Sequence, residues 1–208
     1  FVLKNKKSKV LIFSLSEIKD WEFRIKSETV DVPNTRSDEN LLTGCLTFYK
    51  TYIEDINIIS DSAHCEDAVN FISVSGLVNN IEINNAASDA LDLDFSNLEI
   101  LRATINNAGN DCIDVSAGYY ILNDIQLFNC KDKGLSVGEK SFAEINNLNI
   151  KNTNLAIAIK DSSVTFVSNF TGENINSCIN AYRKKQEFGP VRIKIEQRDC
   201  YGTIEDFI

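Results

Sequence analysis

The sequence lacks any long apolar run. Of its 208 residues, 43% are hydrophobic and 25% are charged, and no segment approaches the roughly 18 consecutive apolar residues that a membrane helix needs. Basic residues are also outnumbered, because 21 Lys and Arg face 30 Asp and Glu, a formal net charge of −9. Such a charge repels nucleic acid phosphates and anionic lipid head groups. We therefore expect no membrane insertion and no nucleic acid partner, and the length predicts one domain.

Histidine is nearly absent as well. The single histidine, His64, lies in a predicted turn before Asp67, so we expect no Ser-His-Asp hydrolytic triad, and one histidine cannot form a three-histidine zinc site. Neither an EF-hand loop nor a glycine-rich calcium repeat is present. The chain begins at Phe1 rather than at Met, so we expect a processed product or a fragment of a larger multidomain chain, in which a targeting segment would not be visible.

The sequence does contain an internal repeat of 22 residues. Five-residue segments align without gaps, and in most of them apolar residues alternate with polar or small ones, which is the period of a half-buried strand. A segment at 45–48 fits at a spacing of 23, as one added residue in the turn at 62–64 would explain. The other aligned segments are 67–71, 89–93, 111–115, 133–137, 155–159 and 177–181.

A second apolar pair recurs in the repeats, with a one-residue slip between Val137 and Leu148. Short segments rich in Ile and Val and punctuated by Asn and Gly exclude helical solenoids, and the spaced leucines of leucine-rich repeats are absent. We therefore predict an all-β fold, a single-stranded right-handed parallel β-helix with 22-residue coils. The regular coils span 42–182, closing coils span 183–208, and residues 1–41 form an N-terminal coil or cap with an inserted loop.

Asparagines recur at Asn85, Asn107 and Asn129, again 22 residues apart. A turn residue in each coil must tolerate a left-handed conformation, and stacked amides can hydrogen-bond between coils. We therefore expect these asparagines to be structural. Residues 14–25 fit either a short helical cap or a further strand, and the Ser-, Asp- and Asn-rich segment 27–41 indicates a surface loop.

Six cysteines are far below the density of small disulfide-stapled domains. The cysteine count therefore does not settle the redox compartment. It also does not settle whether Cys45 and Cys65 are oxidised. Cys112 and Cys178 fall in the column of small residues that includes Ala90 and Gly134. We expect them to be packing residues.

Acidic residues also recur once per coil. Equivalent residues of adjacent coils lie about 4.8 Å apart, and two carboxylates at that distance repel by roughly 3 kcal/mol at an effective dielectric near 20. A shared proton, a bound cation or a basic residue would relieve the repulsion. The second column should face outward, and Lys133 should pair with Asp111. The first column is Asp67, Asp89, Asp111 and Lys133, and the second is Asn70, Asp92, Asp114 and Ser136, with Asp94 beside it.

Three chemistries fit these columns. A solvated acidic face without chemistry is one. Carboxylate oxygens also suit calcium, for which Asp92, Asp94 and Asp114 are the candidate ligands. Paired carboxylates can moreover act as acid and base in glycoside hydrolysis.

Most of the chain resembles the right-handed, pectin-lyase-like β-helix repeat domain of bacterial surface proteins, which also occurs beside spore-coat-type kinase-like domains. This resemblance implies the fold and an extracytoplasmic location. The stretches that carry it are 40–49, 65–70, 88–95, 110–116, 132–141 and 181–190.

Fewer residues resemble polygalacturonase-type glycoside hydrolases. Their successive Asn-Thr-Asp, Gln-Asp-Asp-Cys and Gly-His-Gly-Leu-Ser-Ile-Gly motifs correspond to 87–89, 109–112 and 132–138. The sequence departs from the family at Asn110, which replaces one of the paired carboxylates, and at Lys133, which replaces the histidine.

Two functions therefore stay open. The first is a non-catalytic module of an exported or surface protein that presents its acidic face to a glycan, a cation or a partner domain. Its binding residues would be Asp67, Asn70, Asp92, Asp94, Ser136 and Tyr182.

The second is a polysaccharide-processing hydrolase or lyase. Asp89, Asp111 and Asp114 would be acid, base or cation ligands, and Lys133 their electrostatic partner. Sugar sites often include exposed aromatic rings, for which the sequence offers Tyr119, Tyr120 and Tyr182.

Overall fold

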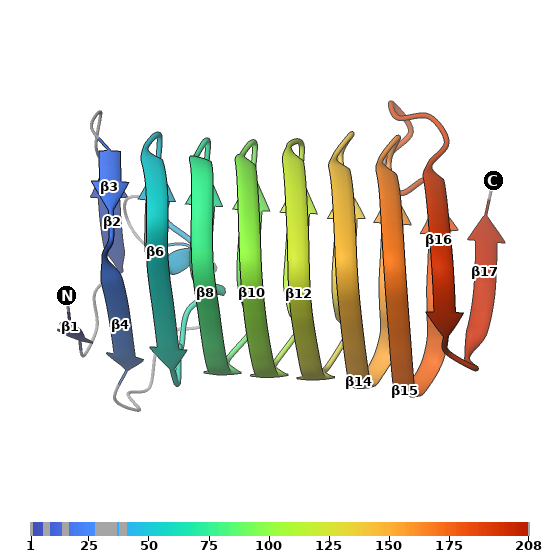
Figure 1. The fold of residues 1–208 in the computed structure, drawn as a ribbon, viewed down its shortest axis with the longest axis horizontal. Coiled ribbons are helices and arrows are strands. Elements are labelled where there is room, and N and C mark those ends of the chain that lie inside the picture. Colours follow the sequence, from blue (N-terminus) through green and yellow to red (C-terminus); the bar gives the residue numbers. More distant parts are fainter. Residues whose placement is uncertain (1, 6–8, 14–16, 28–36, 38–40, 208) are drawn as a thin grey trace.

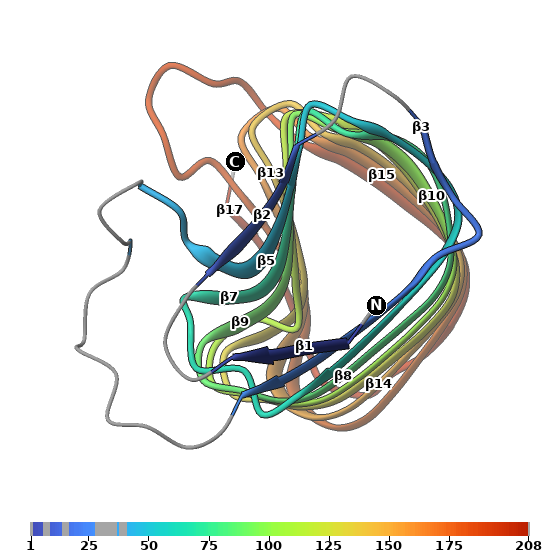
Figure 2. The ribbon, with the colours of Figure 1, turned by 90° about the vertical axis from the view of Figure 1, so that its left-hand side faces the viewer.

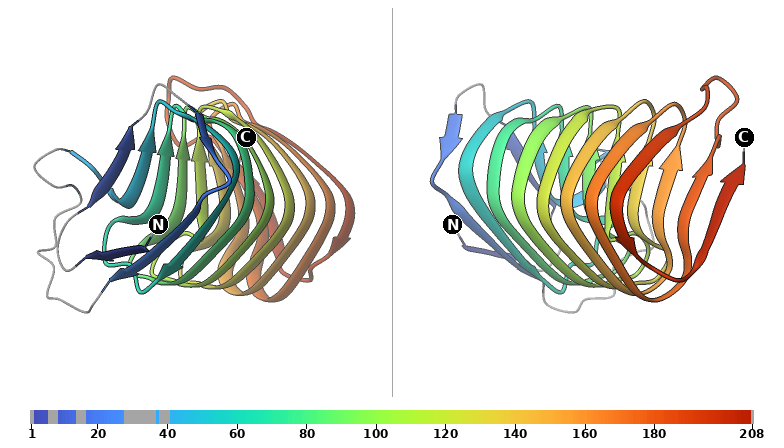
Figure 3. Two further views of the ribbon diagram at one scale, coloured as in Figure 1. Left: turned by 60° about the vertical axis from the view of Figure 1, so that its left-hand side comes forward. Right: turned by 45° about the vertical axis from the view of Figure 1, so that its right-hand side comes forward.

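The computed structural model describes residues 2–5, 9–13, 17–27, 37 and 41–207. Its 17 strands form one parallel sheet that winds into a β-helix of about seven coils (Figures 1 and 3). Each coil takes about 22 residues, which confirms the predicted all-β solenoid. Among the described residues, no helix is long and apolar enough to cross a membrane.

Each regular coil contains a short strand, a tight turn and a long strand. Seen along the axis, the short strands stack into one wall and the long strands complete the outline around a common interior (Figure 2). The short strands are β5 (Gly44–Tyr49), β7 (Asp67–Ile72), β9 (Asp89–Asp94), β11 (Ile113–Ser116) and β13 (Lys133–Gly138). The long strands are β6 (Tyr52–Asp61), β8 (Ser75–Ala86), β10 (Asn97–Ala108) and β12 (Tyr119–Cys130).

Later coils join the two kinds of strand without a break. β14 (Phe142–Lys160) and β15 (Val164–Tyr182) each run through a corner, so their second halves extend the short-strand wall. The last strands are β16 (Arg192–Asp199) and β17 (Thr203–Phe207).

The N-terminal coil is built from β1 (Val2–Asn5), β2 (Val10–Phe13), β3 (Glu17–Lys19) and β4 (Glu22–Ser27). Where residues 14–25 are described, they therefore form strands, not the helical cap that the sequence also allowed. Most of the predicted loop at 27–41 lies outside the described residues.

Strand register locates both irregularities of the repeat. Asp61 pairs with Asn84, 23 residues on, whereas Asp67 pairs with Asp89, 22 residues on. The added residue therefore lies between Asp61 and Asp67, as predicted. The later slip is a turn in which both Glu139 and Lys140 have positive φ, where earlier coils use one such residue.

The interior is filled by the apolar residues that alternate along the strands. Leu91, Ile113 and Leu135 are fully buried and lie in register on adjacent strands. The rings of Phe48 and Phe71 stack at 4.8 Å between centroids. Each such side chain contributes roughly 1.5–3 kcal/mol by leaving water, so the stacked columns stabilise the coil.

The asparagine prediction is confirmed. Asn85, Asn107 and Asn129 have φ of 60°, 61° and 58°, and Asn152 and Asn174 continue the row at 56° and 55°. Their amides bond from coil to coil, as where Asn107 Nδ2 donates to Asn85 Oδ1 at 3.0 Å.

All six cysteines are paired in disulfides, which corrects the prediction that Cys112 and Cys178 only pack. Cys112 and Cys178 are indeed buried, but each is bonded to a second cysteine that lies next to it in the fold. The pairs are Cys45–Cys65, Cys112–Cys130 and Cys178–Cys200. Disulfides persist in oxidising compartments, so three of them favour an extracytoplasmic environment.

Candidate functional site

The acidic columns meet on the outer side of the short-strand wall. Asn70, Asp92, Asp114 and Ser136 are in register on β7, β9, β11 and β13. They alternate with core residues and so point outward, as predicted. Asn70 and Ser136 are nevertheless only 1% and 0% exposed, so part of this outward row is covered by neighbouring groups.

The first column lies where each short strand begins. Asp89 Oδ1 accepts the backbone N–H of Asp111 at 2.8 Å, and Asp111 Oδ1 accepts the backbone N–H of Lys133 at 3.1 Å. Asn110 Nδ2 also donates to Asp89 Oδ1 at 2.7 Å. The carboxylates therefore receive the backbone donor of the next coil, which gives Asp89 and Asp111 a structural role.

Lys133 relieves the charge of this column, as predicted. Its Nζ lies 3.2 Å from Asp111 Oδ1 and also contacts the carboxylate of Asp132. Burial on its own would lower the pKa of Lys133, but hydrogen bonds and attraction to Asp132 and Asp111 outweigh it and hold the pKa above its ordinary value.

Burial raises the pKa of three carboxyl groups strongly. The pKa of Asp67 rises to about 6, although hydrogen bonds from Thr43 and Asn70 oppose the shift. Burial likewise raises the pKa of Asp111 to about 6, with Lys133 opposing. Burial and the charges of Asp67, Asp94, Asp114 and Asp89 raise the pKa of Asp92 to about 9. Asp92 therefore carries a proton at neutral pH.

Asn70 connects the two columns. Its Nδ2 lies within hydrogen-bond distance of Thr43 Oγ1 at 3.1 Å, Asp67 Oδ2 at 3.2 Å and Asp92 Oδ2 at 3.4 Å. Its Oδ1 is buried and has no hydrogen-bond partner, and the same holds for Asp114 Oδ1 and Ser136 Oγ. Thr47 Oγ1, in register with Asn70 on β5, also lacks a partner. Four such atoms therefore lie in one column, although buried polar atoms normally have partners.

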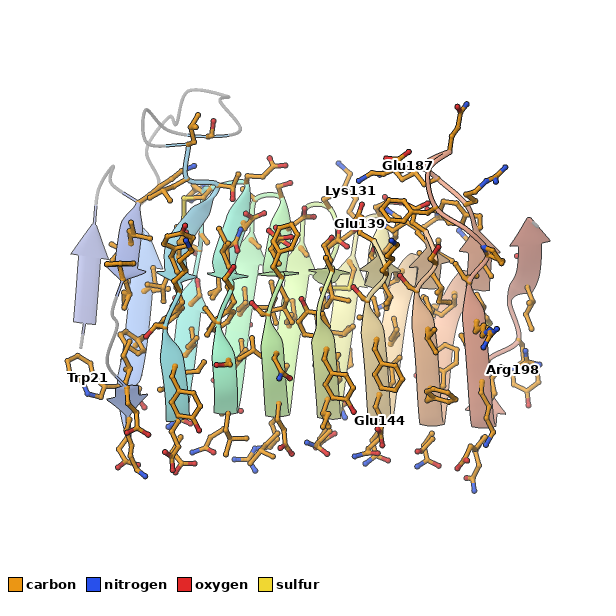
Figure 4. All side chains as sticks on the ribbon, turned by 90° about the horizontal axis from the view of Figure 1, so that it is seen from above. Trp21, Lys131, Glu139, Glu144, Glu187 and Arg198 are labelled. Carbon is orange, nitrogen blue, oxygen red and sulfur yellow. A yellow bond between two sulfur atoms is a disulfide. The ribbon has the colours of Figure 1, made fainter. Side chains whose placement is uncertain are left out.

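A basic group adjoins the acidic row at its C-terminal end. Lys160, at the end of β14, is 5% exposed and places Nζ 3.9 Å from Asp114 Oδ1. Glu139 accepts a hydrogen bond from Ser116 and pairs with Lys185 at 2.6 Å. Burial would raise the pKa of Glu139, but Lys185 and Ser116 lower it below its usual range. Figure 4 places Glu139 on this side of the solenoid and Glu144 on the opposite side.

Lys160 was not predicted, yet the sequence contained a signal for it. Asp94, Ser116, Gly138, Lys160 and Tyr182 follow one another at intervals of 22 residues. Strand pairing joins Asp94 to Ser116, Ser116 to Gly138, and Lys160 to Tyr182. This third column lies directly beside the second.

The aromatic candidates are only partly placed at the site. Tyr182 is half-buried beside Lys160, and burial raises the pKa of its hydroxyl. Tyr120 is fully buried, and its hydroxyl donates to the carbonyl of Leu93 at 2.8 Å, so its expected exposure was wrong. Tyr119 is exposed, but it lies at the start of β12, away from the short strands.

At its other end the third column begins with rings that sequence reasoning missed. Phe13 pairs with Tyr49 and is 56% exposed, with their ring centroids 6.0 Å apart. Tyr49 pairs with Ile72, which pairs with Asp94. An aromatic pair therefore lies at the N-terminal end of the acidic row.

Metal ligation has less support. In the part of the chain that the structure describes, no group of three His, Cys, Asp or Glu side chains is arranged to hold a metal ion. Asp92 and Asp114 are neighbours in register, and Asp94 lies two residues along β9. Calcium at Asp92, Asp94 and Asp114 stays a prediction.

Comparison of the chain with protein-family models, with curated proteins and with solved structures finds no match.

Proposed function

We propose that this chain is a β-helix module of an extracytoplasmic protein and that it binds a glycan along the outer side of β5, β7, β9, β11 and β13. The observation that carries the proposal is the row of partly exposed carboxyl groups on this side, in which Asp92 and Asp114 are in register on β9 and β11 and Asp94 lies beside Asp92. Carboxyl oxygens that solvent reaches can form hydrogen bonds directly with a ligand.

Sugar hydroxyls suit these atoms because each hydroxyl both donates and accepts a hydrogen bond. A hydroxyl beside the Asp114 carboxylate, whose side chain is 29% exposed, can donate a hydrogen bond to it. A carboxyl that is protonated at neutral pH, such as Asp92, can donate as well as accept. The centre of the row therefore favours polyhydroxyl ligands over purely cationic ones.

The direction of the row favours a polymer. Tyr49 and Tyr182 belong to the same column and are separated by six coils, or about 29 Å at 4.8 Å per coil. Rings at both ends can stack on apolar sugar faces, while the carboxyl, amide and hydroxyl groups between them contact successive sugars. A linear glycan lying parallel to the solenoid axis meets both requirements.

Isothermal titration calorimetry with neutral, uronic acid and amino sugar oligosaccharides tests the proposal. At least one oligosaccharide should bind, and Asp92→Asn or Tyr49→Ala should weaken that binding about tenfold or more. Asp124→Asn, an exposed acidic position on β12, is the matched control and should leave the affinity unchanged. If no oligosaccharide binds, or if Asp92→Asn and Asp124→Asn act alike, the proposal is wrong.

One observation favours a second candidate function, cleavage of the glycan. Asp92 and Asp114 are paired in register on β9 and β11, so their strands place them at the separation typical of retaining glycosidases. Asp92 holds a proton at neutral pH and suits the general acid, and Asp114 beside Lys160 suits the nucleophile or base. Asp111 suits these roles less, because its carboxylate is 4% exposed and paired with Lys133.

Product analysis separates cleavage from binding. Incubation of the protein with an oligosaccharide that it binds should release shorter fragments, and Asp114→Asn should abolish release while fragments or intact ligand still bind. A bound oligosaccharide that stays intact over days would leave binding alone as the function. Calcium or EDTA added to both experiments tests the metal prediction, since a calcium-dependent site loses affinity in EDTA.

A further inference from the structure

The opposite side of the solenoid carries an exposed aromatic stripe that the proposed function does not use. Tyr119 and Phe142 are in register on β12 and β14, and their rings stack at 4.8 Å with an interplanar angle of 1°. Phe166 on β15 adds a third ring, 5.7 Å from Phe142. Tyr119 and Phe166 are 42% and 40% exposed.

Two aliphatic side chains widen this stripe. Ile121 lies two residues after Tyr119, and Val164 lies two residues before Phe166, both on the outward side of their strands and partly exposed. We call Tyr119, Ile121, Phe142, Val164 and Phe166 the aromatic stripe. Contiguous apolar side chains on an exposed sheet face are typical of interaction surfaces.

Charges of opposite sign lie at equal distances from the centre of the stripe. Counting from β14, Glu99 lies two strands away on β10, and Lys194 lies two strands away on β16. They occupy the same column, because strand pairing joins Glu99 to Ile121, Ile121 to Glu144, Glu144 to Phe166 and Phe166 to Lys194. Lys194 is exposed and pairs with the exposed carboxylate of Glu196 at 3.1 Å, an ion pair of little energy that can be exchanged.

From this symmetry we infer that the aromatic stripe is the contact surface of a homodimer. In this dimer the two stripes face each other, and a two-fold axis runs parallel to β14 in the plane between them. Each strand of one copy then faces the strand of the other copy that lies equally far from β14 in the opposite direction. Phe142 then meets Phe142 of the second copy, and Glu99 of each copy meets Lys194 of the other, which makes two intermolecular ion pairs. A self-complementary patch of this kind is the requirement of an isologous interface.

One contact, between the two copies of Glu144, opposes association. Glu144 is exposed on β14, close to the proposed axis and on the face opposite Glu139 (Figure 4). It would face its own copy, and like charges at an interface repel. Glu144→Gln should therefore strengthen the dimer, whereas a surface that binds an unrelated partner gives no reason for this substitution to promote self-association.

Sedimentation velocity over a range of concentrations tests the dimer. The parent protein should dimerise, Phe142→Ser should weaken dimerisation about tenfold or more, and Glu144→Gln should strengthen it. Phe95→Ser, at an exposed ring in the turn before β10, is the control and should have no effect. A parent protein that is monomeric at every concentration overturns the inference, and so does equal weakening by Phe142→Ser and Phe95→Ser.

A charge exchange gives the sharper test. Glu99→Lys and Lys194→Glu should each weaken self-association, because each places like charges together twice. A mixture of the two variants should form heterodimers, since the lysine introduced at position 99 of one variant then meets the glutamate introduced at position 194 of the other, and the native Glu99 meets the native Lys194. Circular dichroism confirms that both variants keep the fold. If the mixture associates no better than either variant alone, the proposed arrangement is wrong.

Discussion

The ammonium of Lys133 lies 3.2 Å from Oδ1 of Asp111, one coil away, and the two side chains are only 16% and 4% exposed. The backbone N–H of Lys133 donates to the same oxygen at 3.1 Å. One carboxylate oxygen therefore connects the two coils through both a charge and a backbone bond. The pair ends the acidic column, because Lys133 is in register with Leu155 on the next strand.

Replacing Lys133 should show how much a buried Asp111 carboxylate destabilises the fold when it has no cationic partner. Lys133→Met leaves a carboxylate with no cationic partner in a site that is nearly closed to water, and we expect a loss of about 3 kcal/mol in the free energy of unfolding. Urea denaturation at pH 8 measures it, since Asp111 of the parent, with a pKa of about 6, is ionised there. Lys133→Met combined with Asp111→Asn should recover most of the loss, because no charge is then left buried. A Lys133→Met protein as stable as the parent would contradict this account.

The raised pKa of Asp92 predicts that the fold loses stability as pH rises. An unfolded aspartate has a pKa of about 3.9, whereas burial and neighbouring carboxylates raise the folded pKa of Asp92 to about 9. Between these values the folded chain holds a proton that the unfolded chain releases. The stabilisation is complete below the unfolded pKa and is lost as pH rises toward the folded one, at about 1.4 kcal/mol per pH unit.

Asp92→Asn should remove this slope, because the amide does not titrate. Urea denaturation at pH 5, 6, 7 and 8 gives the free energy of unfolding of the parent, of Asp92→Asn and of the control Asp124→Asn. The parent and the control should share one slope, and Asp92→Asn should be flatter and increasingly more stable than the parent toward pH 8. Equal slopes for all three proteins would show that Asp92 ionises normally in the fold.

The coil and the acidic columns could be predicted because a parallel β-helix converts sequence spacing directly into contact. A residue 22 positions away is a neighbour, so Asp67, Asp89 and Asp111 had to stack, and Lys133 had to join them. The same rule would have identified Lys160, at the spacing that follows Asp94, Ser116 and Gly138. Lys160 was missed because Asp94 is the one acidic residue among these aligned positions.

Contacts between two positions of the same coil were harder to predict, because the repeat does not align these positions with each other. Cys112 was assigned to the small-residue column of Ala90 without its partner, although Cys130 lies in register with Ala108. Ala90 and Ala108 are 18 residues apart, as are Cys112 and Cys130. The disulfide therefore replaces a pair of small residues that occurs one coil earlier, and that comparison could have revealed it.

Burial of the outward side chains could not be predicted from alternation. The period of two assigns Asn70 and Ser136 to the outer side of the wall, but their coverage depends on how neighbouring columns fold over them. Asn70 is covered where its amide contacts Asp67 and Thr43 at the corner before β7. The shape of that corner depends on turns whose conformation the repeat does not encode.

Ala90 and Ala108 occupy the positions of Cys112 and Cys130 in the preceding coil. Replacing both cysteines by alanine therefore measures the stability that the disulfide adds. The double variant Cys112→Ala, Cys130→Ala restores the residues of the preceding coil, so it should pack without a large cavity and keep the fold. Loss of a loop closure of 18 residues should lower the free energy of unfolding by about 3 kcal/mol. Urea denaturation with and without dithiothreitol measures this loss. If the reductant destabilises the parent no more than it does the double variant, this bond contributes no measurable stability beyond that of the other two.

The asparagine row predicts opposite effects of the same substitutions at nearby positions. Asn107 has φ of 61°, a conformation that costs an alanine about 1–2 kcal/mol and glycine almost nothing. Both replacements remove the amide that donates to Asn85, so Asn107→Ala should be less stable than Asn107→Gly by about 1 kcal/mol. Asn84 is the control, since it lies within β8 and is not among the residues with positive φ.

At Asn84 the order should reverse, because glycine in a strand loses more backbone entropy than alanine, by roughly 0.5–1 kcal/mol. Thermal melts of the four single variants give the two differences directly. If alanine is at least as stable as glycine at both positions, the left-handed conformation does not limit the choice of residue in this turn. The asparagines would then recur for their coil-to-coil amide bonds alone.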